Sequence, residues 1–415
     1  MVSIMDRRRS AQAIGSGVVG IAAGALIMSA AMGIRQTFGI FIGPLSHAGF
    51  PMIEIALAIA LQNLVWGFAQ PFAGAIADRC GPAFVVAIGA LAYALGMVLT
   101  ALASSGLYLM LGTGVFVGIG ISCTAFGVVL PAIGRIVASE RRNMAMGLVS
   151  AGSSLGQVVL VPLAQGISDR WGLMASLLAL AGVAAAAAPF GLLLHRPGDR
   201  AIPQEAGHSL PLRAAVVHAL RNPGYRLLTI GFFTCGFQLA FIGTHLPNYL
   251  LLCHLPVGLG ATALSLIGLF NIAGCWGCGW LGGRFRQQYV LGWLYVIRGA
   301  AIAAFLLLPK TSIAVIVFSA VMGLTWLGTV PLTGGLVLKV FGARHLGTLF
   351  GVCFLSHQIG SFFGAWLGGY LFELTGSYSL VWGATAVAGG ITAALHFAIR
   401  DEHIPPAAAA ASAAA

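Results

Sequence analysis

The sequence has very little charge for its length. Lys, Arg, Asp and Glu make up 7% of the 415 residues, against roughly 25% in an ordinary soluble domain. Hydrophobic residues, in contrast, make up 59%. So few ionised groups cannot cover a water-facing surface, which excludes a soluble enzyme, a disordered chain and a fibrous protein. We therefore expect lipid to be the solvent for most of the surface.

Patterns typical of catalysis or of ATP hydrolysis are also missing. The sequence contains no phosphate-binding GxxxxGK[ST] loop, no nucleophile elbow and no zincin motif. The seven cysteines show no spacing of a secreted disulfide framework. Cys275 and Cys278 could share one helical face, but a structural metal site needs four ligands. We predict no enzyme, no cofactor, no metal and no ATP-driven pump, so energy must come from an ion or solute gradient.

Long apolar runs are what the sequence has instead. A bilayer-spanning helix needs about 20 apolar residues, and twelve such runs occur, at 14–42, 53–76, 83–103, 107–137, 144–167, 173–194, 225–252, 262–281, 290–308, 312–340, 346–371 and 378–399. The first run follows three arginines and could be a secretory signal, but it is too long and eleven more runs follow. The chain is predicted to be an all-α integral membrane protein with twelve transmembrane helices.

The polar segments divide these runs into two sets of six. Residues 195–224 carry charges and prolines, which is typical of a linker. We predict six-helix halves at 1–194 and 225–400, a cytoplasmic linker at 195–224, and a disordered Ala-rich tail at 401–415.

The net charge of +11 is explained by topology. With the N-terminus inside, 17 of the 21 Lys and Arg residues fall on cytoplasmic segments, as the positive-inside rule requires. This placement predicts cytoplasmic termini, and it argues against a nucleic-acid partner. We expect a monomer.

The two predicted halves share a spaced set of residues. Four positions recur at an offset of 204, pairing Gly147 with Gly351, Gly156 with Gly360, Asp169 with Glu373, and Gly172 with Gly376. Paired halves of this kind typically place a polar site between them and rock to open it alternately to each side.

The loop after the second run contains Gly74-Ala75-Ile76-Ala77-Asp78-Arg79-Cys80-Gly81. It resembles the loop signature G-x-L-A-D-R-x-G of the major facilitator superfamily. The resemblance implies a cytoplasmic gate that uses Gly74, Asp78, Arg79 and Gly81, with Arg142 and Arg284 as further basic members. The second half keeps the glycines and Arg284 but has Gly283 in place of the acid, so the latch is expected to be one-sided.

Within that superfamily, the chain resembles bacterial relatives of the monocarboxylate transporters and the oxalate/formate antiporter. Arg35-Gln36-Thr37-Phe38-Gly39-Ile40-Phe41 is similar to their first-helix stretch, in which the basic residue serves substrate or proton binding. His357 lies about where the antiporter has a substrate-binding lysine. The eighth run departs from the family, because Asn271 and Cys275 stand where an aspartate and an arginine are usual. This departure leaves carboxylate clamping and proton coupling open.

Arg35, Arg298 and His357 are the basic side chains of the predicted spans that matter most for function. Arg35 is about 31 Å past Ile14 at 1.5 Å per residue, which is near the outer boundary unless the first helix is long and tilted. It could contact an anion in the cavity or extend to the headgroups. Arg298 is about 12 Å into the ninth run, where structural pairing or the same extension is favoured. His357, about 18 Å past His345, could be a packing residue, an anion contact or a proton carrier.

Buried amides and a tryptophan mark helices of both halves. Interhelical hydrogen bonds could satisfy each of them singly, but together they predict a polar cavity lined by Asn63, Gln157, Gln238, Asn271 and Trp326.

These features predict a secondary transporter of a small organic anion of the monocarboxylate type, with or without a coupled proton. Arg35 is the expected anion contact, and His357 the second contact or proton carrier. One alternative keeps the fold but exports drugs or toxic metabolites. Another is a membrane receptor or an intramembrane enzyme, for which the chain shows no sensory domain or catalytic pair.

Overall fold

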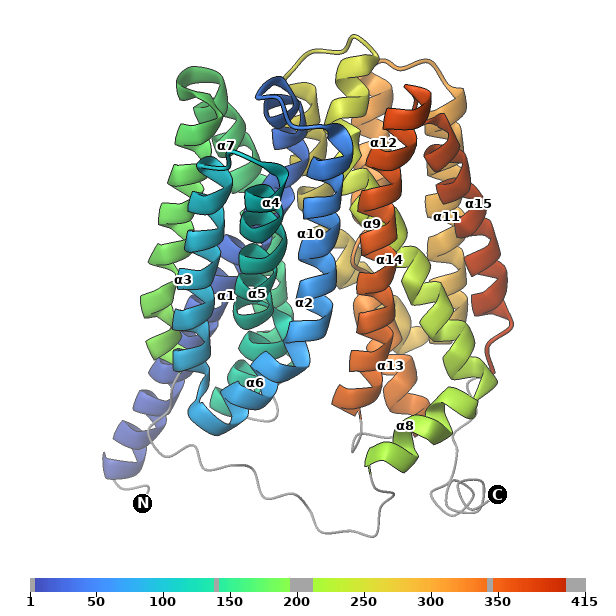
Figure 1. Cartoon of the computed structure of the whole chain (residues 1–415). Coiled ribbons are helices and arrows are strands. Elements are labelled where there is room, and N and C mark those ends of the chain that lie inside the picture. Colours follow the sequence, from blue (N-terminus) through green and yellow to red (C-terminus); the bar gives the residue numbers. More distant parts are fainter. Residues whose placement is uncertain (1–3, 138–141, 195–211, 342–345, 401–415) are drawn as a thin grey trace. The chain divides into compact units, whose positions relative to one another are not determined.

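The computed structural model of the chain describes residues 4–137, 142–194, 212–341 and 346–400 (Figure 1). Within these ranges the regular structure is entirely helical, as predicted. The backbone contacts divide the chain into two compact units, Met1–Ile202 and Pro203–Ala415. Each unit is described by itself below.

The first unit begins with three long helices, α1 (Ile4–His47), α2 (Met52–Cys80) and α3 (Pro82–Ala101). A composite span follows, built from α4 (Gly106–Leu109), the π-helix η1 (Met110–Phe116), α5 (Val117–Thr124) and α6 (Phe126–Ile136). The unit ends with α7 (Arg142–Ala186) and the 3-10 helix η3 (Ala188–Leu194).

The second unit opens with the short helix α8 (Leu212–Arg221). Three long helices follow, α9 (Pro223–Leu252), α10 (Leu259–Arg284) and α11 (Gln287–Leu307). The next span is divided into α12 (Ser312–Thr325) and α13 (Thr329–Phe341). The last two helices are α14 (Leu346–Thr375) and α15 (Ser379–Phe397).

The number of spans agrees with the sequence prediction once one kink is taken into account. Eleven helical stretches of the described residues are long and apolar enough to cross a membrane. One of them, Ala145–Leu194, has 50 residues and would be about 75 Å long as a straight helix, more than twice the apolar thickness of a bilayer. Gly172 breaks it with φ 84° and ψ 168°, so this stretch supplies two spans.

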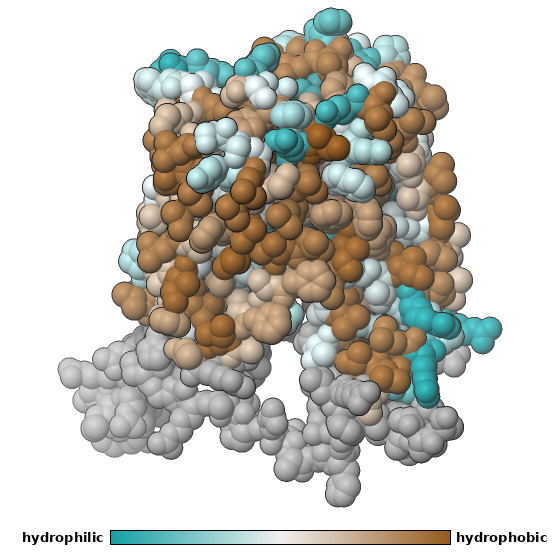
Figure 2. All heavy atoms as spheres, viewed as in Figure 1, coloured by the Kyte–Doolittle hydropathy of each residue, from teal (hydrophilic) through white to brown (hydrophobic). Residues whose placement is uncertain are grey.

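Large apolar side chains lie on the outside of the helices. Leu307 is 82% exposed and Trp276 is 77% exposed. The face shown in Figure 2 is largely covered by hydrophobic residues. Apolar surface on this scale would aggregate in water, and it is the surface that contact with acyl chains requires.

In each unit, one glycine of the 204-residue repeat lies at a close contact between two helices. A Cβ on Gly156 of α7 would collide with the Ser29 carbonyl of α1. A Cβ on Gly360 of α14 would collide in the same way with the Phe233 carbonyl of α9. Small residues permit such approach between membrane helices, where dispersion contacts hold the helices together. The repeat therefore marks equivalent helix contacts in the two units.

We expect Gly156→Ala to destabilise the protein because the added methyl group has no space against α1. Overpacking of this kind costs about 1–3 kcal/mol, so the thermal unfolding midpoint in detergent should fall. Gly360→Ala should do the same through α9. Gly166→Ala is the matched control on α7, because a methyl group there would have no described neighbour within 4 Å; an equal fall in this control would contradict the packing argument.

Candidate functional site

Arg35 lies well inside the first span. Twelve residues separate it from the end of α1 at His47, which is about 18 Å of helix. Its partner Asn63 lies eleven residues after the start of α2 at Met52, about 16 Å in. The sequence placed Arg35 near the outer boundary unless the first helix is long and tilted, and α1 does continue past the expected run, which ended at residue 42.

Neutral groups surround the Arg35 guanidinium. Its Nη2 donates to Asn63 Oδ1 at 2.7 Å and its Nη1 to Gln36 Oε1 at 2.7 Å. Its Cζ lies 5.4 Å from the centre of the Trp66 ring, which is a cation–π distance. Asn63 is itself oriented by a bond from its Nδ2 to the Ile59 carbonyl. These contacts solvate the cation, but none of them is with a carboxylate.

Gln157 lies on α7, which packs against α1 in the first unit. It is 4% exposed and follows Gly156, whose backbone packs against both Ser29 and Gly33 of α1. Gly33 is two residues before Arg35. The predicted lining residues Arg35, Asn63 and Gln157 therefore lie on three helices, α1, α2 and α7, of which α1 contacts both others.

In the second unit a helix is interrupted within a span. Ser312–Phe341 is apolar enough to cross the membrane, yet α12 ends at Thr325 and α13 begins at Thr329. A break of this kind frees backbone N–H and C=O groups that lipid cannot satisfy. Asn271 Oδ1 on α10 accepts a bond from the Leu327 N–H at 3.0 Å.

Arg298 on α11 supplies the donors at the same break. Its Nη2 donates to the Thr325 carbonyl and to the Trp326 carbonyl, the latter at 2.9 Å. Its Nη1 lies 3.3 Å from Gln238 Oε1 and 3.4 Å from Cys235 Sγ, both on α9. Arg298 is fully buried. The sequence favoured structural pairing or snorkelling for this residue, and the structure shows pairing.

Three predicted lining residues therefore meet around an arginine for which the sequence favoured a structural role. Asn271 and Trp326 lie at the helix break, and Gln238 contacts Arg298 there. Cys275 on α10 donates its thiol to Asn271 Oδ1. The sequence does contain one signal for this role, which is a charge in an apolar run with no acid one helical turn away. The partners of Arg298 could not be found in this way, because they lie on α9 and α12, far from it in sequence.

His357 is buried on α14 beside aromatic rings. Its Nδ1 lies 2.9 Å from Gln358 Oε1, and its ring stacks on Phe354 with the centroids 5.9 Å apart. Its backbone carbonyl packs against Gly236 of α9, the residue after Cys235. His357 therefore lies beside the helix that carries Cys235 and Gln238.

Only part of the predicted gate lies within the described residues. Gly81 has φ 86° and ψ 152°, a conformation open almost only to glycine, and the turn expected between α2 and α3 is present. Gly74 lies beside the Gly127 carbonyl, which a Cβ on Gly74 would meet at an ordinary contact distance. The Arg284 guanidinium lies 4.4 Å from the centre of the Trp280 ring. The side chains of Asp78, Arg79 and Arg142 lie outside the described part of the chain.

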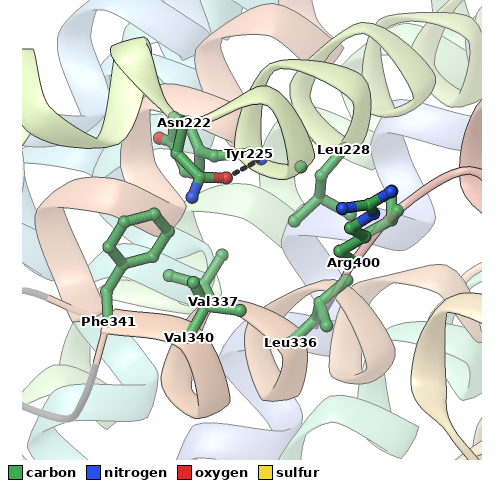
Figure 3. Close-up of a pocket in the computed structure, with 10 residues that line it drawn as sticks. Asn222, Tyr225, Leu228, Leu336, Val337, Val340, Phe341 and Arg400 are labelled. Carbon is green, nitrogen blue, oxygen red and sulfur yellow. Dashed lines mark hydrogen bonds between the residues drawn. The ribbon is translucent and has the colours of Figure 1, made fainter. Parts of the chain in front are cut away.

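A separate pocket lies where α9 begins, between α9, α13 and the residues after α15 (Figure 3). Asn222 caps α9 there by accepting from the Tyr225 N–H at 2.9 Å. Apolar residues of α9 and α13 form most of its wall, with Asn222 and Arg400 as polar members. It includes none of the predicted anion-binding residues.

Comparison with known proteins agrees with this architecture. The family model of the Major Facilitator Superfamily matches residues 12–365. Monocarboxylate transporter 13 of Rattus norvegicus is 26% identical over 374 residues, which cover 86% of this chain and 83% of the relative. The oxalate:formate antiporter of Oxalobacter formigenes is 23% identical over 404 residues, covering 92% of this chain and 90% of the relative.

A solved structure shows the same fold. It is that of a bacterial homologue of the human lysosomal transporter Spinster, with a TM-score of 0.75 and 15% identity, covering 91% of this chain and 95% of that one. Together with the family match over most of the sequence, this confirms the resemblance that the loop signature indicated. The chain belongs to the Major Facilitator Superfamily, and it is a multi-pass membrane transporter and not an enzyme.

Proposed function

We propose that this transporter moves a small organic anion of the monocarboxylate type across the bacterial inner membrane by alternating access, as a monomer with both termini in the cytoplasm. The observation that carries the proposal is the Arg35 guanidinium, which lies inside a span with two amide oxygens and an aromatic ring as its partners. A cation at this depth is costly and is typically retained for function.

The partners of Arg35 suit exchange with a carboxylate. Both hydrogen-bond acceptors, Gln36 Oε1 and Asn63 Oδ1, belong to side chains and not to the backbone. A carboxylate would replace these neutral bonds with charge-assisted ones, which are shorter and roughly twice as strong. The second membrane arginine differs, because Arg298 is bound to backbone carbonyls that cannot leave. Arg35 is therefore the better anion contact of the two.

The relatives support this substrate class through their names alone. One is named as a monocarboxylate transporter and one as an antiporter of oxalate and formate. In the proposed site Asn63 and Gln157 accompany Arg35 in the first unit, and Asn271, Gln238 and Trp326 serve in the second. Gly74, Asp78, Arg79, Gly81, Arg142 and Arg284 form the proposed gate. His357 is the proposed second contact or proton carrier.

We expect proteoliposomes with the wild-type protein to take up labelled monocarboxylates, and Arg35→Gln to lower the initial rate at least about tenfold. The reason is that a hydrogen bond to a charged group is worth about 1.5–3 kcal/mol. Arg170→Gln is the matched control, because Arg170 is exposed beside the kink at Gly172, and it should transport normally.

Two results would contradict this assignment. Equal carboxylate flux in wild type and Arg35→Gln would remove Arg35 from the site. Wild-type vesicles that carry no carboxylate in a panel of mono- and dicarboxylates, yet extrude uncharged drugs, would favour the exporter.

The role of His357 can be separated from that of Arg35 by comparing two transport modes. If His357 carries the coupled proton, His357→Gln should abolish the stimulation of uptake by an imposed pH gradient, because an amide does not titrate near neutral pH. Exchange of labelled for unlabelled anion at equal pH should persist. Loss of both modes would make His357 an anion contact, and retention of the pH stimulation would exclude it as the proton carrier.

A further inference from the structure

The break between α12 and α13 is stabilised by side chains from other helices. Between Thr325 and Thr329 the backbone cannot complete its helical hydrogen bonds, and each buried polar group left unpaired costs about 1–3 kcal/mol. Arg298 from α11 and Asn271 from α10 both reach this segment. An uninterrupted helix would need neither residue.

The two side chains match the polarity of the break. The C-terminal end of α12 exposes carbonyl oxygens and carries partial negative charge, and the cation of Arg298 binds two of these carbonyls. The Leu327 N–H has the opposite polarity, and an acceptor, Asn271 Oδ1, binds it. Each free backbone group that these residues contact therefore has a partner of the right kind.

The Arg298 guanidinium also connects the helix break to α9. Its two Nη atoms reach the Thr325 and Trp326 carbonyls on one side and the Gln238 amide and the Cys235 thiol of α9 on the other. Gln238 continues the link by donating to the Thr385 carbonyl of α15. A lysine ammonium is a single point with three donors, so it could not bridge these acceptors in the same way.

We infer that Arg298 is a positioning residue for transport, which holds the broken helix so that Trp326 and Asn271 keep their places in the proposed site. The inference rests on the proposed function for its transport consequence, but not for its structural one. Both Nη atoms of Arg298 already donate to protein groups, so the role inferred for it is positioning and not contact with the transported anion.

The reactivity of the Cys235 thiol can be used to measure whether the helix break keeps its structure. Its Sγ lies 3.4 Å from Arg298 Nη1 and 3.3 Å from Thr329 Oγ1, the first residue of α13. It is fully buried. If Arg298 holds the break in place, loss of the guanidinium should expose this thiol first. Cys353 is the matched control, because it is equally buried on α14 and its Sγ contacts Thr229 of α9.

The labelling test measures N-ethylmaleimide modification of the two cysteines by mass spectrometry of the full-length protein in liposomes. In Arg298→Gln we expect the modification rate of Cys235 to rise at least about tenfold while that of Cys353 stays within twofold. Arg298→Lys should give a smaller rise. An unchanged Cys235 rate in both variants would overturn the inference, and so would an equal rise at both cysteines, which would mean general loosening.

The transport test uses Arg298→Lys with the carboxylate that wild type takes up. In this variant Trp326 and Asn271 should be displaced. We therefore expect the half-saturation concentration for uptake to rise about tenfold and the maximal rate of uptake to stay within twofold. Arg286→Gln, an exposed arginine at the start of α11, should leave both unchanged. Unaltered half-saturation in Arg298→Lys would overturn the positioning role. Absence of any carboxylate uptake by wild type would refute the proposed function, and the labelling test would still decide the role of Arg298.

Discussion

A guanidinium inside a bilayer has to be solvated by the protein, and the polar structure of both units follows from this constraint. Lipid offers no hydrogen-bond acceptors at that depth, so each arginine needs acceptors from the protein itself. Arg35 finds the side-chain oxygens of Gln36 and Asn63. Arg298 finds the carbonyls at the end of α12. The first arrangement leaves the cation paired with replaceable groups, whereas the second makes it part of the scaffold.

The helix break in the second unit shows how a charged residue can be structural without an acid. The carbonyls at a helix C-terminus carry partial negative charge, and a break inside the membrane leaves them without partners unless a donor arrives. Arg298 donates hydrogen bonds to these carbonyls, and the carbonyls in turn solvate its cation. The free-energy penalty of the helix break and that of the buried charge therefore offset one another. Asn271 contributes a neutral acceptor to the same segment.

Much of the fold could be predicted from the sequence because lipid imposes a simple rule on it. Spans must be apolar, helical and about 20 residues long, so composition and spacing were enough to count them. The structure adds one detail to this count, since α7 runs without interruption through the polar residues Asp169 and Arg170 and is kinked at Gly172. The repeat at 204 residues likewise predicted equivalent glycines, and Gly156 and Gly360 do meet the backbones of α1 and α9. The length of the first helix could not be read in the same way, because α1 continues to His47, past the apolar residues that indicated it.

The sequence by itself determined that the chain is a helical membrane protein of this superfamily and that a few polar side chains lie in its spans. The reason is that hydropathy and the loop signature are local properties. Only the tertiary structure decided which of those side chains meet: Arg35 with Asn63 across 28 positions, and Arg298 with the end of α12 across 27 and 28. A hydrogen bond between helices depends on their rotation and depth. The rotation and depth of each helix follow from packing over the whole unit, so they cannot be predicted from a short stretch of sequence.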